Sequence, residues 1–405
     1  MLMDSAVRGP GASPRSYQID TQKELGGIEA YPLKFTGDGG VFFGIWLVNL
    51  LLVIVTLGLY TPFARRRKIQ YFYTHTLVAG SPLEFTGGLR RMVIGFLLVF
   101  GAYIAYALAA NTGQDVAVAA FVFAGVALAP LLWASAMRFR LASTRWRGIR
   151  GRFSATLGEV YRASWPVLLV ATAWAVSTIV VGQRTLAPPV RIASVGGAFL
   201  VTLLCVVRLE FNYASLLFSR VEFGSQPGRW KPAYRDFVQI WIAAVGFFLA
   251  VVLAVAIVTG VVVGGSIWAL FANAGKGGAA LAMALMMGIA AFLMFFLALG
   301  PARAYREARM FKLIWSNVGL GQVARFRCDL GVKGFVWLRI RNMLFSLITA
   351  GFYRPFAITS EYKMKTESVT LHVKGGLDQL VGQLVNQQGA VGDAIADAVG
   401  LDLVG

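Results

Sequence analysis

Two glutamates near the ends of apolar segments are the residues of this sequence with the clearest potential for chemistry. Glu210 lies ten residues before Arg220, and Glu307 lies ten residues before Asn317, in two segments that follow the same pattern. Each is expected where a membrane helix reaches the cytoplasmic interface. Because ionisable side chains in such places commonly line solute paths or proton relays, we take both as candidate functional residues.

Two arginines in a late apolar segment need partners. Arg339 and Arg341 interrupt the segment 334–353, and an unpaired arginine near the bilayer centre costs at least about 2.5 kcal/mol. The two glutamates are the natural counter-charges, and Arg208 competes for them. The alternative is that both arginines extend to lipid headgroups. We therefore predict an intramembrane charge cluster of Glu210, Glu307, Arg339, Arg341 and Arg208.

Composition indicates what kind of protein holds this cluster. Hydrophobic residues make up 57% of the chain and charged residues 14%, against roughly 25% charged in soluble domains. The net charge of +19 comes from arginines gathered between apolar runs, which is the positive-inside pattern of membrane topology. The composition predicts an all-α polytopic membrane protein and no nucleic-acid partner.

Six of the predicted membrane helices form three hairpins. The apolar run of the third hairpin is longer than a bilayer needs, so we expect its first helix to break near Gly260, Gly264 and Gly265. Basic residues lie between the hairpins, which places those connections in the cytoplasm. The predicted segments are 92–110 with 116–137, 165–181 with 192–207, and 238–263 with 279–300.

Two further membrane helices, 41–60 and 334–353, carry an internal repeat. The residues that recur at a constant offset are Asn49, Thr56, Gly58, Tyr60 and Pro62 in the first copy, and Asn342, Thr349, Gly351, Tyr353 and Pro355 in the second. Proline cannot donate the next helical hydrogen bond, so each copy is predicted to end there. We favour two antiparallel spans, which gives eight in total. The alternative is that both copies re-enter on one side.

The connections between hairpins predict short β-hairpins at the membrane surface. Glycines at nearly fixed spacing, such as Gly80 and Gly148, are flanked by alternating residues, which is typical of tight turns between strands. Segments 368–375 and 32–37 each resemble half of such a hairpin, so we expect the two ends of the array to pair. The predicted organisation is a disordered tail at 1–30, a repeat-built membrane domain at 31–375 and a C-terminal tail at 376–405.

The strongest family resemblance lies in the first repeat copy and its surroundings. The run NLLLVIVTLGLYTPFARRRKIQYFYTHTLVAG, the segment TRWRGIRGRF and the late NMLFSLITAGFYRPFA together resemble the YjgN-like family of bacterial inner-membrane proteins, a domain of unknown function. The resemblance covers roughly residues 31–375. It implies a multi-pass protein of the bacterial inner membrane, and brings no substrate or catalytic residue. Phe63 and Phe356 stand where tryptophan is expected in relatives.

Neither enzymatic chemistry nor a bound metal or cofactor is predicted. His75 and His372 are the only histidines, and Cys205 and Cys328 are too far apart to suggest a metal site. Hydrolase, protease and nucleotide-binding motifs are missing from the sequence. We therefore expect a non-enzymatic protein.

A basic patch next to the membrane suggests lipid as a partner. Arg145, Arg147, Arg150 and Arg152 lie in one connection between hairpins, and each can gain about 1 kcal/mol at an anionic membrane surface. Phosphatidylglycerol or cardiolipin headgroups are the expected ligands. Two functions stay open: a transporter or channel in which the charge cluster lines a polar path, and a structural scaffold that organises anionic lipid.

Overall fold

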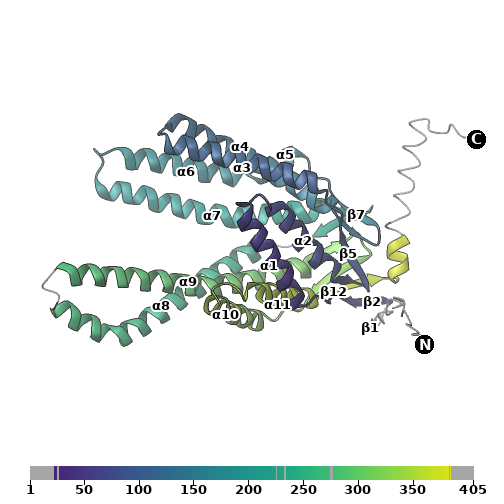
Figure 1. Cartoon of the computed structure of the whole chain (residues 1–405). Helices are drawn as coiled ribbons and strands as arrows, with labels where there is room; N and C mark the ends of the chain where they lie inside the picture. Colours follow the sequence, from purple (N-terminus) through teal and green to yellow (C-terminus); the bar gives the residue numbers. More distant parts are fainter. Residues whose placement is uncertain are drawn as a thin grey trace, which may run out of the picture.

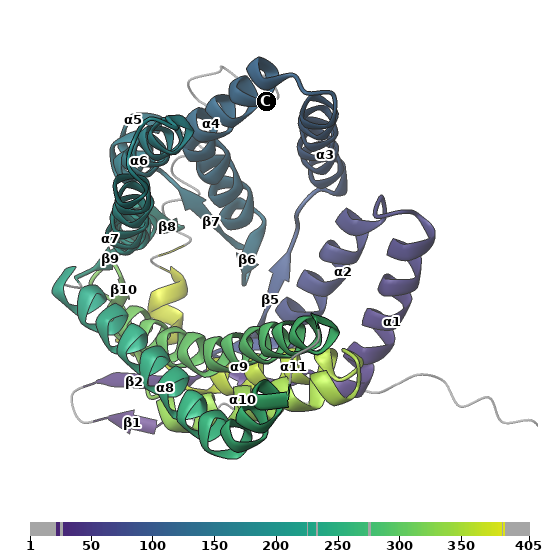
Figure 2. The ribbon, with the colours of Figure 1, turned by 90° about the vertical axis from the view of Figure 1, so that its left-hand side faces the viewer.

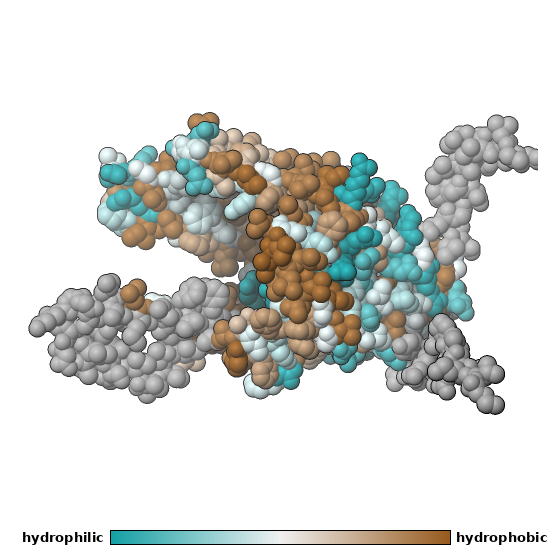
Figure 3. Space-filling model, viewed as in Figure 1, coloured by the Kyte–Doolittle hydropathy of each residue, from teal (hydrophilic) through white to brown (hydrophobic). Residues whose placement is uncertain are grey.

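The computed structural model separates long apolar helices from a small sheet (Figure 1). It describes residues 22–24, 27–224, 226–231, 234–273, 277–382 and 384. The predicted disordered tail at 1–30 therefore lies mostly outside the described residues, as does most of the predicted tail at 376–405. On the face seen in Figure 3, apolar side chains gather along the middle of the described helices, and hydrophilic side chains lie toward the sheet and at the helix tips. This distribution fits a membrane-embedded helical part and a sheet outside the bilayer.

The long helices pack in the three predicted pairs. They are α3 (Leu89–Asn111) with α4 (Asp115–Ala142), α6 (Trp165–Gly182) with α7 (Pro188–Arg220), and α8 (Tyr234–Asn273) with α9 (Gly277–Asn317); the short α5 (Leu157–Ala163) precedes α6. Among the described residues, five helices are long and apolar enough to cross a membrane. The predicted eight are not confirmed. The expected break at Gly260, Gly264 and Gly265 is wrong, because α8 is helical throughout this stretch.

The chain is mostly helical, as predicted for a polytopic membrane protein, but a single antiparallel sheet joins the hairpins, so the all-α class does not describe the whole fold. The strand order is β1-β2-β12-β11-β10-β9-β8-β7-β6-β5-β4-β3. The small hairpins expected between membrane segments pair with one another rather than standing alone. The strands are β1 (Gln22–Glu24), β2 (Ile28–Pro32), β3 (Lys34–Phe35), β4 (Thr76–Val78), β5 (Ser81–Phe85), β6 (Thr144–Trp146), β7 (Ile149–Phe153), β8 (Val221–Phe223), β9 (Gln226–Trp230), β10 (Val318–Leu320), β11 (Ala324–Cys328) and β12 (Val369–Lys374).

The chain itself connects β3, at one end of this strand order, to β2, next to the other end, because β2 and β3 are separated only by Leu33. Leu33 donates its backbone N–H to Val369 of β12 (2.9 Å), and Thr36 donates to His75 next to β4 (2.9 Å). Residues an odd number apart in a strand direct these bonds to opposite edges. The segment therefore bridges β12 and β4 and closes the sheet into a ring, with β1 added beside β2. The predicted pairing of the chain ends is confirmed.

The two segments expected to span the membrane form helical hairpins instead. In the first, α1 (Gly39–Val55) packs against α2 (Thr61–Thr74), and in the second α10 (Val332–Ile348) packs against α11 (Arg354–Glu367). The strands β3 and β4 on either side of the first hairpin pair with each other. That hairpin therefore leaves and returns to one face of the sheet. The preferred prediction of two antiparallel spans is wrong, and the structure agrees with the re-entrant alternative.

The same turn explains why both helices end early. Gly58 and Gly351 each have φ +92 and donate a backbone hydrogen bond five residues back, to Val53 (2.8 Å) and Ser346 (2.7 Å), as in a Schellman helix end. The Thr349 hydroxyl bonds Phe345 O (2.7 Å) and accepts from Tyr353 N (2.9 Å), and Thr56 makes the equivalent bonds. Pro62 and Pro355 begin the return helices, where proline is favoured, rather than ending the first ones.

The helices stand around the ring in chain order when viewed from their tips (Figure 2). The α1–α2 hairpin lies beside the α10–α11 hairpin, where Phe43 stacks on Phe356 at 5.7 Å and Trp46 meets Phe352 edge-on at 6.1 Å. At the hairpin tip, Val55 is 78% exposed and Leu57 88% exposed. An apolar tip that is this exposed fits insertion into lipid.

The ring holds both ends of the membrane domain in one sheet with the basic connections, so we expect both ends on the cytoplasmic side. In spheroplasts of a chain with Cys205 and Cys328 replaced by serine, cysteines at Ile28 and Lys374 should resist an impermeant thiol reagent, because β2 and β12 share the sheet with the basic connections. A cysteine at Val116, 86% exposed near the opposite helix tips, should be labelled. Labelling at Ile28 or Lys374 before lysis would contradict this topology.

The beginning of the predicted C-terminal tail belongs to the core. Leu377, Leu380 and Leu384 are 8%, 2% and 1% exposed, in one buried cluster with side chains of β2, β6, β7 and β12. A Cβ on Gly224, in the β8–β9 turn, would lie 2.5 Å from the Leu384 carbonyl oxygen. The segment therefore crosses the ring at the turn end of the strands.

Candidate charge cluster

Four helices bring charged side chains together between the sheet and the membrane helices. Glu210 lies on α7, Glu307 on α9, Arg339 on α10 and Glu361 on α11. The α9 helix places its charges here because Ala304 and Ala308, both fully buried, let it pack closely against the sheet. The cluster therefore sits where the membrane hairpins meet the ring.

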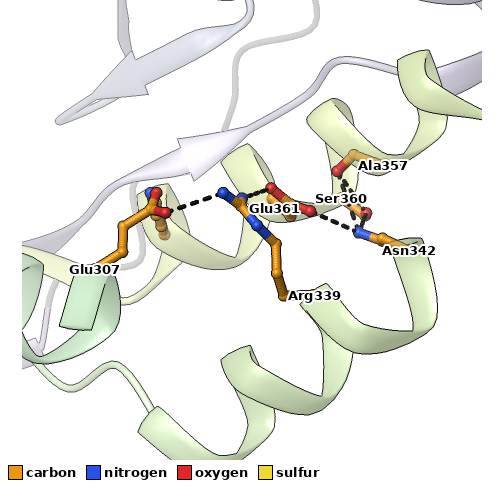
Figure 4. A network of polar contacts seen from close by, with 7 residues as sticks. Glu307, Arg339, Asn342, Ala357, Ser360 and Glu361 are labelled. Carbon is orange, nitrogen blue, oxygen red and sulfur yellow. Dashed lines mark hydrogen bonds and ion pairs between the residues drawn. The ribbon is translucent and has the colours of Figure 1, made fainter. Parts of the chain in front are cut away.

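Glu307 holds cations from two neighbouring helices. Arg339 Nη2 donates to one of its oxygens at 3.0 Å, and Lys365 Nζ donates to the other. Arg339 also donates through Nη1 to Glu361. Figure 4 shows the Arg339 guanidinium lying between the carboxylates of Glu307 and Glu361. The chain of ion pairs thus links α9, α10 and α11.

Asn342, one of the predicted repeat residues, orients this network. Its Nδ2 lies 3.1 Å from Glu361 Oε1, 3.0 Å from Ser360 Oγ and 3.3 Å from the Ala357 carbonyl oxygen, as seen in Figure 4. Asn342 is buried, and so is its counterpart Asn49. The asparagine therefore fixes the start of α11 against α10 and holds Glu361 toward Arg339.

Glu210 has its own partners. Arg306 Nη1 donates to both carboxylate oxygens at 2.9 Å, and Trp241 Nε1 donates to Oε2 at 2.7 Å. The Arg306 guanidinium also lies 4.6 Å from the Trp241 ring centroid, a favourable cation–π distance. Glu210 is thus tied to α8 and α9 by three donated hydrogen bonds.

The two networks line one cavity of about 560 Å³. The charged side chains remain partly accessible, with exposed fractions of 31% for Glu210, 35% for Glu307 and 34% for Arg339. The lining residues are Glu210, Gly300, Arg303, Arg306, Glu307, Met310, Phe311, Ile314 and Arg339. The charges therefore face a space rather than a dry interface.

Glu307 lies beyond the predicted membrane segment 279–300, and its ionisation has opposing causes. Burial favours the neutral acid, whereas the hydrogen bond and charge of Lys365 and the charges of Arg339 and Arg306 favour the carboxylate. The cations prevail, so the pKa of Glu307 lies below its ordinary value. The group is ionised at neutral pH and can pair with both cations.

The structure places three of the five predicted cluster residues on the cavity. Glu307 meets Arg339, whereas Glu210 meets Arg306 instead. Arg341 is exposed, with no ion pair among the described residues. Arg208 lies over the Tyr234 ring at 4.7 Å.

The sequence reasoning missed Arg306, Glu361 and Lys365. Glu361 and Lys365 are four residues apart, on one face of α11. This spacing would have singled them out if the segment after Pro355 had been recognised as a helix.

The predicted basic patch lies on the β6–β7 hairpin and has nearby acidic residues. Arg147 Nε donates to Ser81 Oγ at 2.7 Å, Arg145 is in register with Glu84 and with Arg150, and Arg152 is in register with Glu222. Arg150 and Arg152 are exposed. These two arginines have the most freedom to meet lipid headgroups.

Metal ligands do not gather in the part of the chain that the structure describes, where no group of three His, Cys, Asp or Glu residues could hold an ion. Cys205 and Cys328 are buried free thiols. His75 Nδ1 lies 2.7 Å from the Tyr71 carbonyl oxygen at the end of α2, a structural contact. His372 lies on β12 in register with Arg325.

Comparison with known proteins gives a consistent result. A family model described as "Bacterial protein of unknown function (DUF898)" matches residues 30–398. The "Inner membrane protein YjgN" of Salmonella typhimurium is 24% identical over 379 residues, covering 88% of this chain and 91% of that protein. The protein of the same name from Escherichia coli O157:H7 is 25% identical over 146 residues, 35% of this chain and 36% of that protein. No solved structure matches the chain.

Proposed function

The chain belongs to the DUF898 family, as a YjgN-like multi-pass protein of the bacterial inner membrane, and we propose that it provides a transport or channel-like path for a solute. The proposed role is binding and passage rather than catalysis. Family membership brings no substrate, so the proposal rests on the arrangement of the charged residues.

The cavity carries this proposal. Charged side chains packed without a cavity would indicate a sealed scaffold, whereas Glu210, Glu307 and Arg339 line a space of about 560 Å³, within the range of small-molecule sites. The cavity lies at the junction of α7, α9 and α10, close to the ends of two membrane hairpins and one re-entrant hairpin. Substrate sites of transporters commonly lie at the interface between structural repeats.

A second candidate is an anionic-lipid-organising scaffold. It is favoured by the low burial of the described membrane helices, for which at most 17% of each apolar window is buried. Hairpins with so little protein contact present most of their surface to lipid, and Arg150 and Arg152 are exposed on the β6–β7 hairpin. In this model the charge cluster only joins the re-entrant hairpin to α9.

Flux through proteoliposomes separates the two candidates. Glu210→Gln and Arg306→Gln should each change the light-scattering response to gradients of small potassium salts at least severalfold, because each removes a charge from the cavity wall. Arg309→Gln is the matched control, since Arg309 is exposed on the same helix and does not line the cavity. Unchanged flux in correctly inserted variants would remove the transport proposal and leave the scaffold.

A further inference from the structure

The carboxylates of the cavity are already occupied. Both oxygens of Glu210 accept hydrogen bonds from Arg306, one of them also from Trp241. The two oxygens of Glu307 accept from Arg339 and Lys365. Each carboxylate therefore has its charge balanced by a cation of the protein. A cationic ligand would have to displace these partners before it could bind.

The cavity wall has more hydrogen-bond donors than its carboxylates use. Arg303 lines the cavity, is exposed, and has no hydrogen-bond or ion-pair partner among the described residues. Arg306 uses only Nη1 toward Glu210, which leaves its Nε and Nη2 without a described acceptor. The two residues are three positions apart on α9, so their side chains lie on the same face of the helix. The unused capacity in the cavity is thus made of guanidinium N–H groups.

The charge count agrees with this inventory. The wall carries three guanidinium groups, from Arg303, Arg306 and Arg339, and two carboxylates, from Glu210 and Glu307. Guanidinium groups only donate hydrogen bonds, and their planar fork matches carboxylate and phosphate oxygens. A ligand that completes this wall must supply acceptors and negative charge.

Another part of the wall is apolar. Met310, Phe311 and Ile314 line the cavity one to two turns beyond Arg306 on the same helix. A purely ionic ligand would leave the partly exposed Phe311 and Ile314 facing water, whereas an organic anion could cover them. The volume of about 560 Å³ exceeds what one small inorganic ion needs.

We infer that this cavity binds an organic anion whose phosphate or carboxylate meets Arg303 and Arg306 and whose apolar part contacts Met310, Phe311 and Ile314. The inference deepens the proposed function, and rests on it for the view that the ligand is carried. The same chemistry could come from a soluble metabolite-sized anion or from the phosphodiester of a lipid. The structure thus indicates the charge of the ligand and its amphipathic character.

Binding of butyl phosphate to the full chain in neutral detergent tests the inference. Titration at constant ionic strength should show saturable binding, whereas butylammonium should not bind. Arg303→Gln should weaken butyl phosphate about tenfold, because one charge-assisted contact is lost, and Arg303→Lys should lie between. Arg309→Gln, the matched control, should bind like the unaltered chain.

Glu210→Gln should change the affinity for butyl phosphate in the opposite direction. It frees the Arg306 guanidinium, so butyl phosphate should bind more tightly, whereas a cation site would lose affinity. Unaltered binding in Arg303→Gln, or tighter binding of butylammonium than of butyl phosphate, would overturn the inference.

Two further experiments distinguish a lipid ligand from a soluble one, and the anion site from the transport function. If the ligand is a lipid, phosphatidylglycerol nanodiscs should weaken the binding of butyl phosphate by competition, relative to phosphatidylcholine nanodiscs. Equal affinity for butyl phosphate in both lipids would indicate a soluble anion. Arg303-dependent binding without altered flux would keep the anion site and remove transport. If flux depends on Arg306 but the chain does not bind butyl phosphate, the transport proposal is kept and the anion site is removed.

Discussion

Glu307→Gln is expected to destabilise the chain more than any other single change in the charge cluster. The substitution removes the carboxylate that Arg339 and Lys365 share and leaves two cations close together. Removing one partner of a fully buried pair costs about 3–5 kcal/mol. Because Glu307 and Arg339 are about one-third exposed, solvent screening reduces the expected loss to about 1–3 kcal/mol.

Thermal unfolding in detergent measures this loss, and two variants make it specific. Lys365→Met in the Glu307→Gln background should recover part of the stability, since it removes the cation left without a carboxylate. Glu84→Gln is the control: Glu84 is an exposed acid on β5, and its loss should change stability by less than about 0.5 kcal/mol. A Glu307→Gln chain as stable as the parent would show that the ion pairs contribute nothing.

The effect of Glu307 should depend on pH with a definite sign. Its pKa is lowered in the folded chain from an ordinary value of 4.5, so its contribution is present above that value. It is lost as the pH falls through the lower folded pKa. The difference between the parent and Glu307→Gln should therefore be constant near pH 7 and shrink below pH 4.5. A difference that grows on acidification would contradict this assignment.

Leu380→Asp should release the C-terminal segment from the ring. Leu380 is 2% exposed, and Leu377 and Leu384 hold the same cluster. Release gives up the burial of Leu377 and Leu384, roughly 1.5–3 kcal/mol each, and burying an ionised carboxylate without a partner costs more than both together. The segment is therefore expected to leave, while the strands, which are held by their own hydrogen bonds, remain paired.

A cysteine at Val373 reports this release. Val373 is fully buried in the cluster that contains Leu380, so in a chain without other cysteines its labelling rate should rise at least tenfold in Leu380→Asp. Gln379→Asp adds the same charge at the neighbouring exposed position and should leave the rate unchanged. Continued protection of Val373 in Leu380→Asp would mean that the segment does not cover this part of the ring.

Apolar length and basic connections were enough to predict the membrane hairpins, and glycine spacing was enough to predict the strands of the ring. The error at 41–60 has a local cause. All 20 positions are compatible with a membrane helix, yet Leu57 and Gly58 adopt positive φ, so the helix ends at Val55. The basic run Arg65–Lys68 lies within the return helix α2.

The sequence could predict the part of the candidate site in which a charged residue would be costly without a counter-charge. Arg339 in an apolar segment required a carboxylate, and Glu307 lies beside it. Arg306 could not be placed in the same way, because one basic residue among several in a cytoplasmic segment carries no such cost. Which of these arginines meets Glu210 depends on how α7 and α9 are rotated against each other, and rotation is set by packing rather than by spacing along the chain.

The closure of the ring through Leu33 has a consequence for synthesis. Each membrane hairpin can enter the bilayer as it is made, and its strands find neighbours that are close in sequence, which favours early formation. The edge of β2 is different, because its partner β12 is made almost last. Until then a nascent or truncated chain carries an open strand edge, the kind of surface on which chains pair with one another and aggregate. The completed chain covers this edge with its own C-terminal strand, so β12 protects the protein against self-association as well as completing the sheet.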